Sequence, residues 1–120
     1  NIGAEVGIAL SPGTPLDSLE YVIEDTDNII LMTVNPGYKG QPLVPQTMNK
    51  IQKLDELLKK MNLRDKVTIS VDGNVNPKTI PEMISRGADN LILGSSSLFD
   101  KKNTITKNFE KIISAIDSVK

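Results

Sequence analysis

The chain has no cysteine and no histidine among its 120 residues. The lack of cysteine excludes disulfides, thiolate chemistry and zinc sites of the cysteine type. The lack of histidine removes the commonest general base and the commonest transition-metal ligand together. Acid–base chemistry within this chain would therefore depend on carboxylates, lysines or tyrosines.

Neither sign of charge is in excess, since 14 basic and 15 acidic residues leave a net charge of −1. Basic residues do not cluster among aromatic residues, which make up only 3% of the chain, so we expect no nucleic-acid partner. No apolar run approaches the length needed to span a bilayer, so we also expect no membrane partner. These absences favour a soluble, cytoplasmic protein.

The chain has the length of one ordinary domain, and its hydrophobic content of 38% is enough for a core of that size. It opens with Asn1-Ile2-Gly3, without a methionine and without a charged-then-apolar leader. No linker, low-complexity tract or block of charge interrupts it. We therefore expect residues 1–120 to form one domain, or part of one from a longer chain, with no internal boundary.

Short apolar runs alternate with longer segments of helical periodicity. The runs are mostly apolar rather than strictly alternating, which is typical of strands buried on both faces. A strand followed by a helix, repeated along the chain, requires parallel strands with right-handed crossovers, and so predicts an α/β fold. The predicted strands are residues 5–11, 28–35, 66–72 and 90–95.

The helices are predicted from capping signals and apolar stripes. Thr14-Pro15 and Asn76-Pro77 each place a capping side chain before a proline suited to the first helical turn, so helices are expected to begin there. Two further segments have apolar residues every three or four positions, and each should bury one stripe. The stripes are Met48, Ile51, Leu54, Leu58 and Met61, and Phe109, Ile112, Ile113 and Ile116. The helical carboxylates expected to form solvated faces are Asp17, Glu20, Glu24, Asp25, Asp55, Glu56 and Glu110.

Four βα units fit a small doubly wound sheet or half of a (β/α)8 barrel, and the typical barrel length of about 250 residues favours the half. In both folds ligands bind at the carboxyl ends of the strands. Glycines beside polar groups at these ends suit a phosphate, although βα turns also use such residues for their own geometry. Barrels usually bind phosphate at the loops after strands seven and eight. The four predicted strands of this chain would therefore be strands five to eight of a barrel. The strand ends are Ser11, residues 35–41, residues 72–74 and residues 94–96.

The strand ends lie within four recognisable stretches of sequence. They are "VGIALSPGTPL" from residue 6, "LMTVNPGYKGQPL" from residue 31, "SVDGNVNPKTI" from residue 70 and "GADNLILGSSSLF" from residue 87. In this order and spacing, they resemble strands five to eight of the ribulose-phosphate 3-epimerase family. The resemblance covers nearly the whole chain and implies the C-terminal half of a (β/α)8 TIM barrel with parallel strands.

The resemblance implies an isomerase of carbohydrate metabolism, in the pentose phosphate pathway, that epimerises a ketose phosphate at C3 through an enediolate. In that family two aspartates transfer protons on opposite sides of the carbon, and both bind a divalent metal beside two histidines. Asp72 matches the aspartate after strand seven, and is therefore predicted as a catalytic residue and a metal ligand. The metal, which could be zinc, iron, manganese or cobalt, would stabilise the enediolate oxygens as a Lewis acid.

The same resemblance implies the substrate-binding residues. Met32 matches a methionine that lines the reacting centre, and Gly73 and Asn74 match backbone around the sugar phosphate. The loop that closes over substrate would contain Gly37, Tyr38, Lys39 and Gly40. The phosphate-binding residues would be Gly94, Ser95 and Ser96.

The chain departs from the family pattern in two ways. Asn74 replaces a glycine usual in ribulose-phosphate epimerases but not in allulose-6-phosphate 3-epimerases, so both ribulose 5-phosphate and allulose 6-phosphate stay open as substrates. The first aspartate, both histidines and a serine, which the family takes from strands one to four, are absent. The missing N-terminal half barrel is therefore a predicted partner.

The chain by itself is expected to be inactive and to form a homo-oligomer. The strand edges at residues 5–11 and 90–95 would be open in a half barrel, and open edges pair with other strands. An alternative of a different class is a noncatalytic α/β module that binds a small phosphate.

Overall fold

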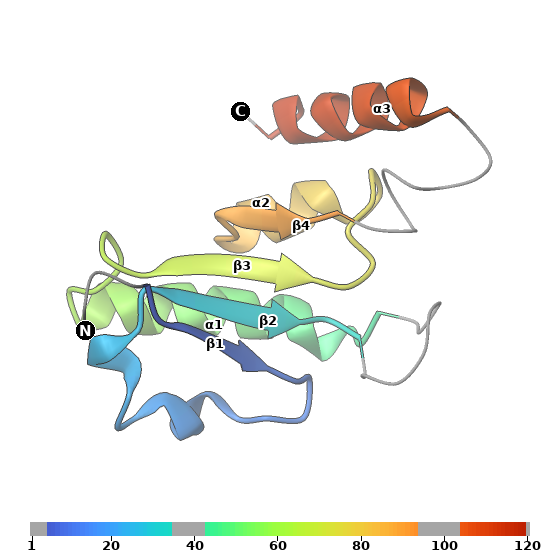
Figure 1. Ribbon diagram of the computed structural model, residues 1–120. Helices are drawn as coiled ribbons and strands as arrows, with labels where there is room; N and C mark the ends of the chain where they lie inside the picture. Colours follow the sequence, from blue (N-terminus) through green and yellow to red (C-terminus); the bar gives the residue numbers. More distant parts are fainter. Residues whose placement is uncertain (1–4, 35–42, 94–103, 120) are drawn as a thin grey trace.

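The computed structural model describes residues 5–34, 43–93 and 104–119. Within them, four parallel strands form one sheet in the order β1-β2-β3-β4 (Figure 1), which confirms the predicted α/β fold. The strands are β1 (Gly7–Leu10), β2 (Asn28–Met32), β3 (Thr68–Asp72) and β4 (Asn90–Ile92). The helices are α1 (Gln46–Lys60), α2 (Ile80–Arg86) and α3 (Ile105–Asp117), with the 3-10 helices η1 (Leu16–Leu19) and η2 (Ile23–Asp25). None of these described helices combines the length and apolar character that crossing a bilayer would need.

One face of the sheet carries the hydrophobic core. Ile29 and Leu31 of β2 pair in register with Ile69 and Val71 of β3, and all four side chains are at most 1% exposed. Helices α1 and α2 cover this face and lie behind the sheet in Figure 1. Each fully buried side chain of this size contributes about 1.5–3 kcal/mol. The predicted stripe of α1 is confirmed at Met48, Ile51, Leu54 and Leu58, whereas Met61, just beyond the helix, is exposed.

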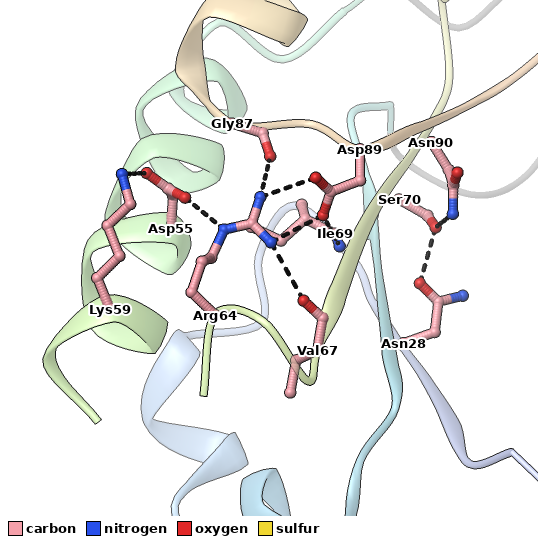
Figure 2. A network of polar contacts seen from close by, with 10 residues as sticks. All are labelled: Asn28, Asp55, Lys59, Arg64, Val67, Ile69, Ser70, Gly87, Asp89 and Asn90. Carbon is pink, nitrogen blue, oxygen red and sulfur yellow. Dashed lines mark hydrogen bonds and ion pairs between the residues drawn. The ribbon is translucent and has the colours of Figure 1, made fainter. Parts of the chain in front are cut away.

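The opposite face of the sheet has no helix over it in the described part of the chain (Figure 1). The register places Ala9, Ile30, Ser70 and Asn90 in one row across the strands, and these side chains share this uncovered face because strand side chains alternate. Ser70 Oγ donates to Asn28 Oδ1 at 2.7 Å, and Asn90 Nδ2 donates to Ser70 Oγ at 3.4 Å (Figure 2). A chain of polar side chains thus crosses the uncovered face.

The prediction of an α-helix that begins at Thr14-Pro15 is wrong. Two short 3-10 helices, η1 and η2, take its place. Val22 and Ile23 are β-branched and disfavour a continuous α-helix. Glu24 and Asp25 would also place negative charge at a helix C-terminus, where the helix dipole is unfavourable for it.

The helix predicted at Asn76-Pro77 exists but begins later than expected. Asn76 Oδ1 accepts hydrogen bonds from the backbone N–H groups of Lys78 at 2.9 Å and Thr79 at 3.2 Å, which forms an Asx turn. Helix α2 then starts at Ile80. The predicted capping residue therefore closes the turn that leads into the helix.

The apolar stripe predicted for α3 is buried only in part. Ile112 is 2% exposed, but Phe109 and Ile113 are 52% and 40% exposed. Helix α3 packs chiefly against α2, beyond the edge of the sheet in Figure 1, so only a narrow strip of its surface is covered. The residues that it buries are Asn108, Ile112 and Ala115.

Candidate functional site

Met32 and Asp72 lie next to each other at the carboxyl end of the sheet. They are register partners at the ends of β2 and β3, and Ile92 of β4 is next in the same row. Both are half-buried, on the uncovered face that also holds Ser70. Among the described residues, the Asp72 carboxylate has no partner in a hydrogen bond or an ion pair. The arrangement presents a carboxylate on a rigid strand, available to a proton or a ligand.

The turn that follows Asp72 has a left-handed backbone. The φ angle is 119° at Gly73 and 48° at Asn74. A Cβ at position 73 would lie 2.8 Å from Thr33 Oγ1 and 2.9 Å from Val34 Cγ2, so both the conformation and the space require glycine. Asparagine enters the left-handed region more readily than most residues. The structure therefore brings Gly73 and Asn74 beside Asp72, and their contact with a sugar phosphate stays a prediction.

Thr33, which the sequence pattern does not mark, ties the end of β2 to this turn. The residue is fully buried. Its backbone N–H donates to the Asp72 carbonyl at 2.8 Å, and its hydroxyl lies within hydrogen-bond distance of the carbonyls of Asp72, at 3.2 Å, and Gly73. A threonine at the end of an apolar run is ordinary strand composition. Only the tertiary contact distinguishes it.

At the carboxyl end of β1, the strand-end residue Ser11 acts through its carbonyl group. Lys50 of α1 donates from its ammonium group to the carbonyls of Ser11, at 2.9 Å, and Thr14. Burial lowers the pKa of Lys50. This lysine was not a predicted site residue, and it fastens the loop after β1 to α1.

The remaining predicted site residues lie outside the residues that the structure describes. Their roles in loop closure and phosphate binding therefore stay predictions. They are Gly37, Tyr38, Lys39, Gly40, Gly94, Ser95 and Ser96.

Among the described residues, Asp72 is a single potential metal ligand rather than part of a cluster. Protein sites for divalent cations combine several oxygen, nitrogen or sulfur ligands. Over residues 5–34, 43–93 and 104–119, no three carboxylate, histidine or cysteine side chains come together in a way that could hold a metal ion. The described residues do not build a metal site by themselves. The divalent cation therefore stays a prediction.

Arg64 organises the opposite, amino end of the sheet (Figure 2). Its Nε donates to Asp55 Oδ1 at 2.5 Å, and its Nη1 and Nη2 donate to the two oxygens of Asp89 at 2.8 and 3.0 Å. The carbonyls of Val67, at 3.2 Å, and Gly87, at 2.9 Å, accept the other two bonds. All the guanidinium N–H donors are thereby used. One side chain joins α1, the start of β3, the end of α2 and the start of β4.

Asp55, predicted to lie on a solvated helix face, is instead part of this network. Its side chain is 14% exposed and forms ion pairs with Arg64 at 2.5 Å and Lys59 at 2.9 Å. Burial acts to raise the pKa of Asp55, but the hydrogen bonds and charges of Arg64 and Lys59 outweigh it and lower the pKa overall. The prediction for Asp55 failed because Arg64 approaches from a different segment of the chain.

Comparison with known proteins relates the chain to one enzyme family. The model of the ribulose-phosphate 3 epimerase family matches residues 1–99. The ribulose-phosphate 3-epimerase of Methanocaldococcus jannaschii is 38% identical over 113 residues, which are 92% of this chain and 47% of that protein. The Escherichia coli K12 protein of the same name is 34% identical over 116 residues, which are 97% of this chain and 48% of that protein. The chain thus spans about half the length of the curated relatives that it matches.

A solved structure also supports the fold, and this chain again matches about half of it. The 3-hexulose-6-phosphate synthase from Salmonella typhimurium, a TIM barrel, matches with a TM-score of 0.59 and 18% sequence identity. The match covers 98% of this chain and 52% of that chain, and at this identity it concerns the fold alone. Together with the family match over residues 1–99, these relationships show that the chain belongs to the ribulose-phosphate 3-epimerase family.

Proposed function

We propose that the protein containing this chain is a ketose-phosphate 3-epimerase, and that Asp72 is one of its two proton-transferring groups. The observation that carries the proposal is the Asp72 carboxylate itself. It is half-buried at a strand end and has no partner among the described residues, in a chain that belongs to the epimerase family. An ion pair would favour the charged form and weaken the carboxylate as a base. Asp72 has no such pair within that described part, so its carboxylate oxygens are available to substrate.

In the proposed reaction, the Asp72 carboxylate accepts the proton on C3, next to the ketose carbonyl. The electron pair of the broken C–H bond forms the C2–C3 double bond, and the carbonyl oxygen takes up the negative charge as an enediolate. Inversion at C3 then requires a proton delivered to the opposite face of the carbon. One carboxylate reaches only one face of the carbon, so this second acid would come from another part of the protein.

Met32, Gly73 and Asn74 have positioning roles in this proposal. Met32 is the register partner of Asp72, so its flexible apolar side chain would line the reacting carbon and exclude water. The left-handed turn at Gly73 and Asn74 would bring backbone N–H groups toward the anionic oxygens of the substrate. Ribulose 5-phosphate and allulose 6-phosphate are both retained as substrates.

The phosphate group would bind after β4, at Gly94, Ser95 and Ser96. The register supports this location, because Ile92 of β4 pairs with Asp72 and the segment after β4 therefore begins beside the carboxylate. Glycine allows close approach to a phosphate and serine provides hydroxyl donors. The loop of Gly37, Tyr38, Lys39 and Gly40 would close over the bound substrate.

We further propose that residues 1–120 supply strands five to eight of a barrel, whose other half covers the uncovered face. The match to 52% of a TIM-barrel chain supports this, as do the exposed Ala9 and Ile92 on that face. In the described sheet β1 and β4 are the edge strands, so their unpaired backbone groups are available for pairing. Sedimentation of the isolated 120-residue chain tests the point, with an oligomer as the expected result. A monodisperse monomer would contradict it.

Exchange of the C3 proton with solvent deuterium tests the proposed function. The protein containing this chain is incubated in D2O with ribulose 5-phosphate or allulose 6-phosphate. Asp72→Asn should lower the exchange rate by about 10²–10⁴-fold, because the amide cannot accept the proton. The matched control is Asp65→Asn, which changes an exposed carboxylate at the amino end of β3 and should leave the rate unchanged. Comparable rates in the two variants would refute the role of Asp72.

A noncatalytic module that binds a small phosphate is the second candidate. The observation that favours it is the single carboxylate, since the described residues hold no cluster of potential metal ligands around Asp72. In this case titration calorimetry would detect phosphosugar binding, while the unmodified protein would show no exchange at C3. Exchange above the uncatalysed rate would exclude the module.

A further inference from the structure

We propose that Thr33 is a positioning residue that holds Asp72 in the orientation required for proton transfer. The inference rests on the proposed function of Asp72. Thr33 acts through the backbone of the turn after β3 and does not itself contact the substrate. Neither the strand pattern nor the family motif assigns it this task.

The contacts of Thr33 constrain both peptide groups beside Gly73. The Thr33 N–H donates to the Asp72 carbonyl at 2.8 Å, and the Thr33 hydroxyl is 3.2 Å from the same oxygen. The hydroxyl also bonds to the carbonyl of Gly73. Because the Asp72 carboxylate projects from the backbone held in this way, its direction depends on these contacts.

The surroundings of Thr33 leave no substitute for its hydroxyl. Thr33 is 0% exposed, so water cannot replace a lost hydrogen bond without a rearrangement. The turn also packs tightly against Thr33, since a Cβ at Gly73 would lie 2.8 Å from Thr33 Oγ1. Loss of the hydroxyl would therefore shift the turn, and a displacement of about 1 Å at a reacting group can cost about 10²-fold in rate.

Thr33 is itself held from a second direction. Its carbonyl accepts a hydrogen bond from the N–H of Val44 at 2.7 Å, and Val34 and Leu43 form an antiparallel bridge next to it. These contacts prevent Thr33 from following the turn if the turn moves. The residue therefore serves as a fixed support for Asp72.

Thr26, just before β2, provides a matched control for Thr33, just after it. It is also 0% exposed, and its hydroxyl donates to the Val22 carbonyl at 2.7 Å. Replacing either threonine by valine removes one buried hydroxyl, but only the change at Thr33 touches the backbone of Asp72.

The test compares Thr33→Val, Thr33→Ser and Thr26→Val in the protein that contains this chain. Steady-state kinetics with the ketose phosphate should show a kcat about 10–100-fold lower for Thr33→Val, with KM within about threefold. Thr33→Ser should restore kcat to within about threefold, because it keeps the hydroxyl. Thr26→Val should leave kcat unchanged, even where its melting temperature falls as far as that of Thr33→Val. Equal losses of kcat in the two valine variants, or no rescue by serine, would overturn the inference.

A second measurement separates this inference from the proposed function. If the unmodified protein shows no exchange at C3, the proposed function fails, and backbone amide exchange over residues 70–76 still reports on the turn. Thr33→Val should speed this exchange by about tenfold, whereas Thr26→Val should not change it. Unchanged amide exchange in Thr33→Val would show that Thr33 does not hold the turn.

Discussion

The two ends of the sheet differ in whether their charged side chains are paired. At the amino end, Arg64 satisfies all its donors with Asp55, Asp89 and two backbone carbonyls. At the carboxyl end, the Asp72 carboxylate is half-buried and has no partner among the described residues. Carboxylates are thus paired at one end of the sheet, and one carboxylate is left available at the other.

With the proposed role of Asp72, this difference would separate the residues that stabilise the fold from those that react. Paired charges with short hydrogen bonds tie together segments that are distant in the sequence. An unpaired carboxylate contributes little to stability but keeps its capacity to accept a proton. In βα folds ligands bind at the carboxyl ends of the strands, so the amino ends are free to be cross-linked.

The largest effect on stability is expected for Gly73→Ala. The new Cβ would lie within 2.9 Å of both Thr33 and Val34, at a φ of 119° that side chains other than glycine rarely adopt. The free energy of unfolding should fall by about 2–4 kcal/mol in urea denaturation. At Gly13 a Cβ would meet nothing within 4 Å, so Gly13→Ala should change the free energy of unfolding by less than about 0.5 kcal/mol. A tolerated alanine at position 73 would show that this turn is not rigid.

Arg64→Met should lower the free energy of unfolding by about 1.5–3 kcal/mol, because it removes charge-assisted hydrogen bonds in a region that is only partly exposed. The matched variant Arg86→Met breaks an ion pair with Glu82, whose side chain is 49% exposed. It should cost less than about 1 kcal/mol. Exchange at C3 should persist in Arg64→Met once the protein is folded. Loss of exchange in folded Arg64→Met would mean that the two ends are coupled.

The acid limb of the stability curve should depend on Asp55. The lowered pKa of Asp55 means that its carboxylate stabilises the folded state above the ordinary pKa of about 3.9, and that this contribution is lost as the pH falls through the lowered pKa. Asp55→Asn should therefore be less stable than the unmodified protein at pH 7, and the two stability curves should converge on acidification. Thermal melts between pH 7 and pH 2 would show this. Parallel curves would contradict the sign of the shift.

The smallest effect is expected for Asp72→Asn. The Asp72 carboxylate has no partner in the described part of the chain, so the free energy of unfolding should change by less than about 0.5 kcal/mol. Asp89→Asn is the contrasting variant, because Asp89 accepts bonds from Arg64 and from the N–H of Ile69 at 2.9 Å. It should cost about 1–2 kcal/mol. A large loss of stability in Asp72→Asn would mean that this carboxylate has a structural partner after all.

The fold was predictable where a local pattern suffices. Parallel strands follow from alternating apolar runs and helices, and the buried stripe of α1 follows from its periodicity. The same reasoning failed at Phe109, because the burial of a helix face depends on which other elements pack against it. It failed at Thr14-Pro15 because a good start signal cannot overcome an unfavourable sequence further along.

The candidate site was predictable only in part, for a related reason. The motif indicated Asp72 and Gly73, and the register of β2 and β3 places Met32 beside them. Thr33 and Lys50 were not predicted, because each acts through backbone carbonyls of a distant segment. Contacts of this kind leave no periodic signal in the sequence.

The sequence by itself determined the strands, the stripe of α1, the glycine in the turn after Asp72 and the family motifs, since each depends on residues close together along the chain. Only the tertiary structure decided that Met32 meets Asp72, that Arg64 closes the amino end, and that the Thr33 hydroxyl reaches a carbonyl 40 positions away. The physical reason is that periodicity and turn chemistry are local. Register and buried hydrogen bonds are instead selected when strands and helices pack together and exclude water.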